Sequence, residues 1–187
     1  LAEAMVNDTD RPRQGNYLYG AFGRDFATLD GKRLMVVGLT GMQWRRLTKA
    51  TGLREPVAAL AARLGLDFED EGDRYRARQE IARLLEPWFH ARTLAEAALT
   101  LDAHGVTWGP YRSVREEIAT DPDCSTDNPL FTLTEQPGIG TYLMPTTPLD
   151  FGRLPRLPAT PAPRLGEHTD QILLDILGLS EAEVGRL

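Results

Sequence analysis

The chain has little of what stabilises small secreted domains or anchors a protein in a membrane. Its 187 residues include one cysteine, Cys124, and no apolar run approaches the roughly 20 residues that span a bilayer. A single cysteine excludes an internal disulfide framework and is typical of the reducing cytoplasm. The formal net charge of -6 argues against a surface for nucleic acid. We therefore expect a cytoplasmic protein that binds neither nucleic acid nor membrane.

The familiar motifs of catalysis and of metal or nucleotide binding are also missing. There is no Gly-x-Ser-x-Gly elbow, Cys-x-x-Cys pair, His-Glu-x-x-His helix or P-loop. Residues 67–72 fit the start of a calcium loop, but Arg78 stands where that loop requires a bidentate glutamate. Gly138 and Gly140 are followed by Leu143, where a dinucleotide fingerprint needs a third glycine. The residues alone predict a soluble α+β protein with no metal site and no visible catalytic group.

The first part of the chain has the pattern of a β-hairpin followed by helices. Residues 17–28 and 33–39 are rich in strand-forming residues, and Asp30-Gly31 between them favours a type I′ turn. Capping residues, prolines and glycines then mark four helices, and Pro87 is expected to kink or restart the third. The predicted helices, with the residues that start and stop them, are 40–52, 56–65, 73–85 and 93–105.

The remainder of the chain predicts short elements and a marked excess of acid. Residues 1–115 carry 17 Lys and Arg against 15 Asp and Glu, whereas residues 116–187 carry 4 against 12. A buried strand is expected at 106–111, and Ser113-x-x-Glu116 is a capping box that opens the next helix. Two further strands and an extended linker with four prolines are predicted at 130–133, 140–144 and 152–163.

The most ordered pattern lies near the end of the chain. Arg164-Leu-Gly-Glu-His-Thr-Asp170 leads into an apolar helix that Gly178 can end, and Ser180-x-x-Glu183 is a second capping box. The apolar face of this tail is too continuous to be left in water, so we expect it to dock on another part of the protein. That face consists of Leu165, Ile172, Leu173, Ile176 and Leu177.

This tail resembles the C-terminal signature of the family III CoA-transferases (CaiB/BaiF type), which include formyl-CoA transferases and α-methylacyl-CoA racemases. Trp108-Gly-Pro-Tyr111 and Thr147-Pro-Leu-Asp-Phe151 also resemble segments of that family. The resemblance implies that the chain is the C-terminal half of a longer protein. Residues 1–15 would be a linker and active-site loop, residues 16–103 a small α+β domain, and residues 104–187 a segment returning to complete an α/β Rossmann-like large domain.

The resemblance also implies an activity and its partners. Family members are intertwined homodimers in which an aspartate of the N-terminal half acts as the nucleophile. We therefore assign no catalytic residue in this chain, and we expect no cofactor beyond the coenzyme A of the substrate. An intermolecular acyl-CoA:carboxylate CoA-transferase, a racemase and a non-catalytic dimerisation module remain alternatives, because the residues that would separate them are expected outside this chain.

The stretch ahead of the predicted hairpin is the candidate substrate-binding segment. Formyl-CoA transferases carry a mobile run of glycines there, whereas this chain has the stiffer Arg11-Pro-Arg13. That difference favours an intramolecular, isomerase-like branch of the family, acting on the acyl-CoA thioester of a dicarboxylic acid. Ordinary strand packing for the aromatic residues and solvated charge for the arginines are the alternative roles. The candidate substrate-binding residues are Arg11, Arg13, Gly15, Asn16, Tyr19 and Phe22.

Overall fold

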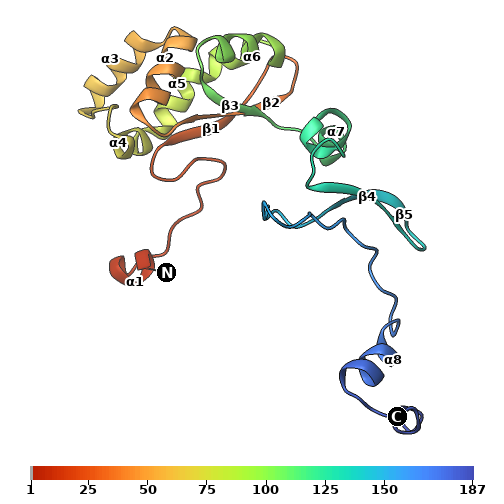
Figure 1. Ribbon diagram of the computed structural model, residues 1–187. Coiled ribbons are helices and arrows are strands. Elements are labelled where there is room, and N and C mark those ends of the chain that lie inside the picture. Colours follow the sequence, from red (N-terminus) through yellow and green to blue (C-terminus); the bar gives the residue numbers. More distant parts are fainter. Residues whose placement is uncertain (1) are drawn as a thin grey trace. The chain divides into compact units, whose positions relative to one another are not determined.

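The computed structural model describes residues 2–187, which form two compact units (Figure 1). The first unit runs to Tyr111 and the second is Arg112–Leu187. The first unit extends past the predicted boundary at residue 103, because strand β3 (Thr107–Pro110) pairs with strand β2 (Arg33–Gly38). Within the described residues, no helix is long and apolar enough to cross a membrane.

The first unit contains a three-stranded antiparallel sheet in the order β1-β2-β3. Strand β1 (Phe22–Ala27) and β2 form the predicted hairpin, with Phe22 opposite Gly38 and Ala27 opposite Arg33. β1 starts at Phe22 and not at residue 17, because the chain before it turns at Gly15 and Gly20, whose φ angles are 60° and 80°. Such left-handed backbone interrupts an extended strand.

The turn between β1 and β2 is not the type I′ turn that we predicted. A type I′ turn needs positive φ at both central residues, and apart from glycines only Asp8 has positive φ in the described chain. Gly31 alone takes the left-handed conformation, and its N–H donates to the Thr28 carbonyl at 3.0 Å. The Asp30 carboxylate instead accepts hydrogen bonds from the Thr28 hydroxyl (2.6 Å) and the Leu94 N–H (3.1 Å). The hairpin tip is thereby fixed to the start of a distant helix.

Five helices pack with the sheet, and their ends follow local signals. Thr93 forms a capping box with Glu96 as predicted, and Thr40, predicted as a cap, forms one with Gln43, while Gly52 and Gly65 end helices with φ of 70° and 65°. The helix predicted at 73–85 is two helices that meet at Ala77, and the second continues through Pro87. The helices are α2 (Gly41–Thr51), α3 (Arg54–Leu64), α4 (Glu71–Arg76), α5 (Arg78–His90) and α6 (Leu94–Ala103).

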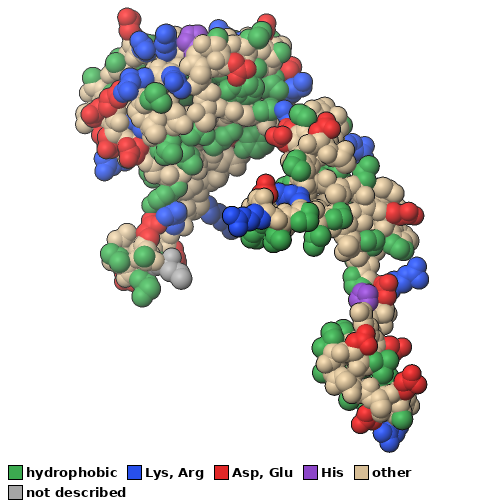
Figure 2. Space-filling view, in the orientation of Figure 1, with side chains coloured by type: hydrophobic (Ala, Val, Ile, Leu, Met, Phe, Trp, Pro, Cys, Tyr) green, Lys and Arg blue, Asp and Glu red, His purple; other side chains and the backbone are tan. Residues whose placement is uncertain are grey.

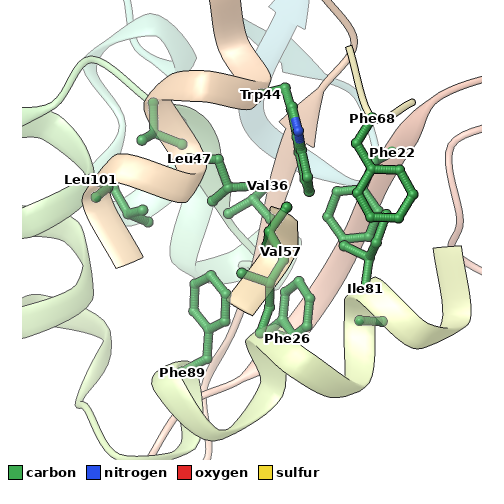
Figure 3. Close-up of a cluster of buried hydrophobic side chains, with 14 of the residues drawn as sticks. Phe22, Phe26, Val36, Trp44, Leu47, Val57, Phe68, Ile81, Phe89 and Leu101 are labelled. Atoms are coloured by element: carbon green, nitrogen blue, oxygen red, sulfur yellow. The ribbon is translucent and has the colours of Figure 1, made fainter. Parts of the chain in front are cut away.

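The core lies between the sheet and these helices (Figure 3). The Trp44 ring lies edge-on to Phe22 and Phe68, with ring centroids 5.6 and 6.2 Å apart, and Phe26 stacks on Phe89 at 4.4 Å. A side chain at Gly38 would place a Cβ atom 3.2 Å from the Trp44 ring, so glycine lets α2 approach β2 closely at this point. The other core residues labelled in Figure 3 are Val36, Leu47, Val57, Ile81 and Leu101.

A buried arginine joins the sheet to the α3–α4 connection. The fully buried Arg74 donates to the carbonyls of Phe68 (2.6 Å), Glu69 (2.9 Å) and Leu39 (2.7 Å). Burial lowers the pKa of Arg74, and the nearby carboxylate of Glu71 opposes that shift. Backbone carbonyls thus take the place of water around this guanidinium.

The second unit contains a β-hairpin, formed by β4 (Phe131–Gln136) and β5 (Gly140–Pro145), and short helices. The two predicted strands are confirmed, and the Gln136 side chain holds the proline-rich segment by accepting from the Ala162 N–H (2.7 Å) and donating to its carbonyl (3.2 Å). Hydrophobic side chains lie on the visible surface of this unit (Figure 2). The remaining elements are α7 (Val114–Thr120), η1 (Pro122–Cys124), α8 (Thr169–Gln171), the π-helical turn η2 (Ile172–Ile176) and α9 (Glu181–Val184), with α1 (Ala2–Asn7) in the first unit.

We expect replacement of Arg74 by Met to destabilise the first unit by about 3 kcal/mol, because three buried carbonyls lose a charged donor. All three tryptophans, Trp44, Trp88 and Trp108, lie in the first unit, so urea unfolding followed by tryptophan fluorescence reports on it alone. Arg76→Met is the matched control, since the Arg76 side chain is 70% exposed. Equal unfolding midpoints for the two variants would contradict a structural role for Arg74.

The capping box of α6 should make stability depend on pH. Glu96 accepts hydrogen bonds from the Thr93 N–H and hydroxyl, both at 2.8 Å, and these lower its pKa below the ordinary 4.5. Because the folded pKa is lowered, this contribution is present above pH 4.5 and is lost as the pH falls through the folded value. We expect the stability difference between wild type and Glu96→Gln to shrink between pH 6 and pH 3. Glu86→Gln, within α5, is the control; an unchanged Glu96→Gln difference over that range would contradict the prediction.

Candidate functional site

The segment that precedes β1 is folded back on itself. The Leu18 N–H donates to the Gly23 carbonyl at 2.8 Å, and Gly20 between them has a φ of 80°. A Cβ atom at Gly23 would lie 2.9 Å from the Leu18 Cβ, so this contact requires glycine. The predicted substrate-binding segment therefore has a defined conformation next to the sheet.

Arg11 and Tyr19 form the first half of a charged aromatic cluster. The Arg11 guanidinium lies 3.5 Å from the centre of the Tyr19 ring and pairs with Glu3 in α1. The Tyr19 hydroxyl also donates to Glu3, at 2.7 Å. The hydrogen bonds from Arg11 and then Tyr19 lower the pKa of Glu3, and the bond to Glu3 raises the pKa of Tyr19. Glu3 is thus held as a carboxylate that neutralises Arg11.

The second half of the cluster contains two arginines around Tyr17. The guanidinium carbons of Arg24 and Arg78 lie 5.2 and 5.7 Å from the Tyr17 ring centre, and Arg24 donates to the Tyr17 hydroxyl at 3.1 Å. The Tyr75 ring connects the halves, with Tyr19 at 5.1 Å and the Arg78 guanidinium at 4.3 Å. We call this set the arginine–tyrosine cluster; its members are Arg11, Tyr17, Tyr19, Arg24, Tyr75 and Arg78.

The structure distributes the predicted site residues unevenly. Arg11 and Tyr19 lie in the cluster, while Gly15 is one of the turning glycines in the segment that leads to it. Arg13 and Asn16 are exposed. Phe22 is fully buried and packs on Trp44, so its side chain lies in the core and offers no surface to a ligand.

Four members of the cluster are absent from the predicted substrate-binding residues: Tyr17, Arg24, Tyr75 and Arg78. The signal for Arg24 was its place in β1, where Phe22 and Phe26 lie two residues away on the same face. An arginine on an otherwise apolar strand face predicts a specific partner. Tyr75 and Arg78 lie on either side of the α4–α5 junction, and only the packing of these helices brings them to Tyr17.

The cluster can bind anions, because it offers guanidinium donors and aromatic hydroxyls. In residues 2–187, no three His, Cys, Asp or Glu side chains are arranged to hold a metal ion. A groove of about 450 Å³ near Trp44 and Phe68 also contains two arginines, namely Arg45, which is paired with Glu69 at 2.5 Å, and the exposed Arg54. The arginine–tyrosine cluster is the stronger candidate for recognition of an anionic ligand, because two of its half-buried arginines approach one tyrosine ring.

Comparison with known proteins identifies relatives over the whole chain. The family model of CoA-transferase family III matches residues 1–169. The chain is 73% identical over 187 residues to 2-methylfumaryl-CoA isomerase of Chloroflexus aurantiacus. The aligned region covers 100% of this chain and 46% of that protein. It is 31% identical over 121 residues to formyl-CoA:oxalate CoA-transferase of Rhodopseudomonas palustris. This aligned region covers 65% of this chain and 28% of that enzyme. The chain thus spans less than half the length of these relatives.

Solved structures show the same fold. A CaiB/BaiF family protein from Brucella suis superposes with a TM-score of 0.61 at 20% identity, covering 94% of this chain and 43% of that protein. The family model covers most of the chain, including the arginine–tyrosine cluster, and the alignment with 2-methylfumaryl-CoA isomerase extends over the whole chain. This chain therefore belongs to CoA-transferase family III.

Proposed function

We propose that this chain is the C-terminal part of an enzyme that moves coenzyme A between the two carboxyl groups of one dicarboxylic acid, namely 2-methylfumarate. One observation carries the proposal: the 73% identity to 2-methylfumaryl-CoA isomerase extends over all 187 residues. The fixed conformation of the segment before β1, closed by the Leu18–Gly23 hydrogen bond, agrees with a site that need not admit a second acid.

In the proposed reaction, an aspartate outside this chain attacks the C1 thioester carbonyl. The carbon–sulfur bond breaks and an acyl anhydride forms, and the released CoA thiolate then attacks the aspartyl carbonyl and frees the C1 carboxylate. The C4 carboxylate of the same acid attacks the aspartyl thioester, and CoA returns to the C4 carbonyl of the new anhydride. The aspartate is regenerated, so the reaction needs no other acceptor.

Retention of the acid between the two steps gives the advantage of an intramolecular reaction. The acid must turn from one carboxyl group to the other without leaving the site. We propose that the segment of residues 11–24 forms one wall of that site. Its contacts are suited to this role, because Glu3 and Arg11 tie its start to α1 and the Leu18–Gly23 contact fixes its end.

We further propose that the first unit is the small domain of the complete enzyme and that the second unit contributes to its Rossmann-like large domain, in an intertwined homodimer of the cytoplasm. The exposed apolar side chains of the tail support this assignment. Leu165, Ile176 and Leu177 are 107%, 74% and 62% exposed in the described chain. Such side chains would be buried against the large domain.

An intermolecular CoA-transferase is the second candidate, favoured by the 31% identity to formyl-CoA:oxalate CoA-transferase. To separate the two, the complete gene product is incubated with the C1 thioester and isotopically labelled free 2-methylfumarate. We expect isomerisation without label in the thioester, because the acid does not leave the enzyme. Incorporation of label at the rate of isomerisation would instead establish exchange with free acid.

The tail assignment predicts that Ile176→Asp destabilises the complete gene product by several kcal/mol, since a charge would enter the core of the large domain. The measurement is the thermal unfolding midpoint. Asp175→Ala, which changes the exposed neighbouring residue, should leave the midpoint nearly unchanged. If Ile176→Asp behaves like the control, the apolar face of the tail is not buried.

A further inference from the structure

We propose that Arg24 and Arg78, both beside the Tyr17 ring, are the receptor for an anionic group of the acyl-CoA substrate. This inference rests on the proposed function and assigns a role to two residues that the sequence patterns did not single out. Both arginines are half-buried, and both approach the same aromatic ring. Two cations therefore converge on one patch of the first unit.

The charges of these two arginines are not balanced within the described chain. Within the described first unit, several arginines besides Arg24 and Arg78 have no carboxylate within the 4.0 Å of an ion pair, but most of these are exposed to water; the exposed ones are Arg13, Arg46, Arg54 and Arg63. Arg24 and Arg78 are half-buried and lack such a carboxylate in residues 2–187, and the Nε of Arg78 is buried without a hydrogen-bond partner there. Arg24 donates a hydrogen bond to the Tyr17 hydroxyl, and Arg78 donates one to the Tyr75 carbonyl at 2.9 Å.

An unbalanced pair of half-buried cations is costly, and a bound anion removes that cost. Two like charges repel each other, and partial burial strengthens the repulsion because less water screens it. An oxyanion close to both is attracted by both, and guanidinium groups match carboxylate and phosphate oxygens with pairs of parallel hydrogen bonds. The arrangement therefore favours an oxyanion as the partner that completes this half of the cluster.

Arg11 provides the internal contrast. It also stacks on a tyrosine, but it is already paired with Glu3, whose second oxygen accepts from Tyr19. Arg11 and its tyrosine thus form a closed structural unit, whereas Arg24 and Arg78 keep donor capacity for a ligand. The role that we first assigned to Arg11 and Arg13 is better suited to Arg24 and Arg78.

The proposed substrate has oxyanions of two kinds, the free carboxylate of the acyl group and the phosphates of coenzyme A. Three ligands separate them: 2-methylfumaryl-CoA, its methyl ester at the free carboxyl group, and 2-methylfumaryl-pantetheine, which lacks every phosphate. Dissociation constants are measured by titration calorimetry with the complete gene product and with its Arg24→Met, Arg78→Met and double variants. Arg83→Met, with a 69% exposed side chain on α5, is the matched control.

We expect each single variant to bind 2-methylfumaryl-CoA on the order of 10- to 100-fold more weakly than wild type, since a charged hydrogen-bond donor is lost. If the receptor holds the carboxylate, this loss disappears for the methyl ester and persists for the pantetheine thioester. If the receptor holds a phosphate, the loss persists for the methyl ester and disappears for the pantetheine thioester. Arg24→Lys and Arg78→Lys, which keep the charge, should restore part of the affinity.

Binding of all three ligands with wild-type affinity by folded Met variants would overturn the inference, and so would an equal loss for all three. If the Met variants unfold at a lower temperature but keep their affinity, carboxylates elsewhere in the complete protein balance Arg24 and Arg78, and the inference is wrong. Because the readout is affinity and not rate, a loss of binding is seen whether or not the thioester is isomerised. Failure of the wild-type protein to isomerise the thioester would contradict the proposed function separately.

Discussion

The position of the arginine–tyrosine cluster depends on the buried guanidinium of Arg74. Its hydrogen bonds to Leu39, Phe68 and Glu69 join the end of β2 to the connection between α3 and α4. Without these bonds, three carbonyls and a cation would have to reach water in the middle of the first unit. Arg74 also lies 5.8 Å from the Trp44 ring centre, so the polar link and the aromatic core meet at one place.

Because Arg74 is fixed by its hydrogen bonds, the positions of the residues next to it in sequence are fixed as well. Helix α4 starts at the Asp70 cap, which accepts from the Asp73 N–H at 2.9 Å, and ends at Ala77, where α5 begins. Tyr75 and Arg78 lie three residues apart on either side of Ala77, and the ring of Tyr75 lies under the guanidinium of Arg78. The candidate anion receptor is therefore a product of helix geometry that is fixed by a structural arginine.

The sequence predicted those features that depend on neighbours along the chain. Capping boxes at Thr40, Thr93, Ser113 and Ser180 are visible in sequence because both partners lie three residues apart. The hairpin turn was predicted wrongly because Asp30 is held by Leu94, a contact over 64 positions. The cluster was only partly predicted for the same reason, since Tyr17 meets Arg78 through tertiary packing. The resemblance to family III supplied the family and the proposed activity, which local patterns could not give.

The pairing of β3 with β2 has a consequence for how the first unit can form. Strand β2 lies in the middle of the sheet, and it pairs with residues 107–110, which lie 70 to 76 positions after their partners in β2. Until that segment arrives, β2 is an edge with unpaired N–H and C=O groups that could pair with another chain. During synthesis, five helices are therefore made between β2 and β3, and the third strand can pair only after them. Pairing with residues 107–110 removes the open edge from β2 and leaves the shorter β3 at the edge of the sheet.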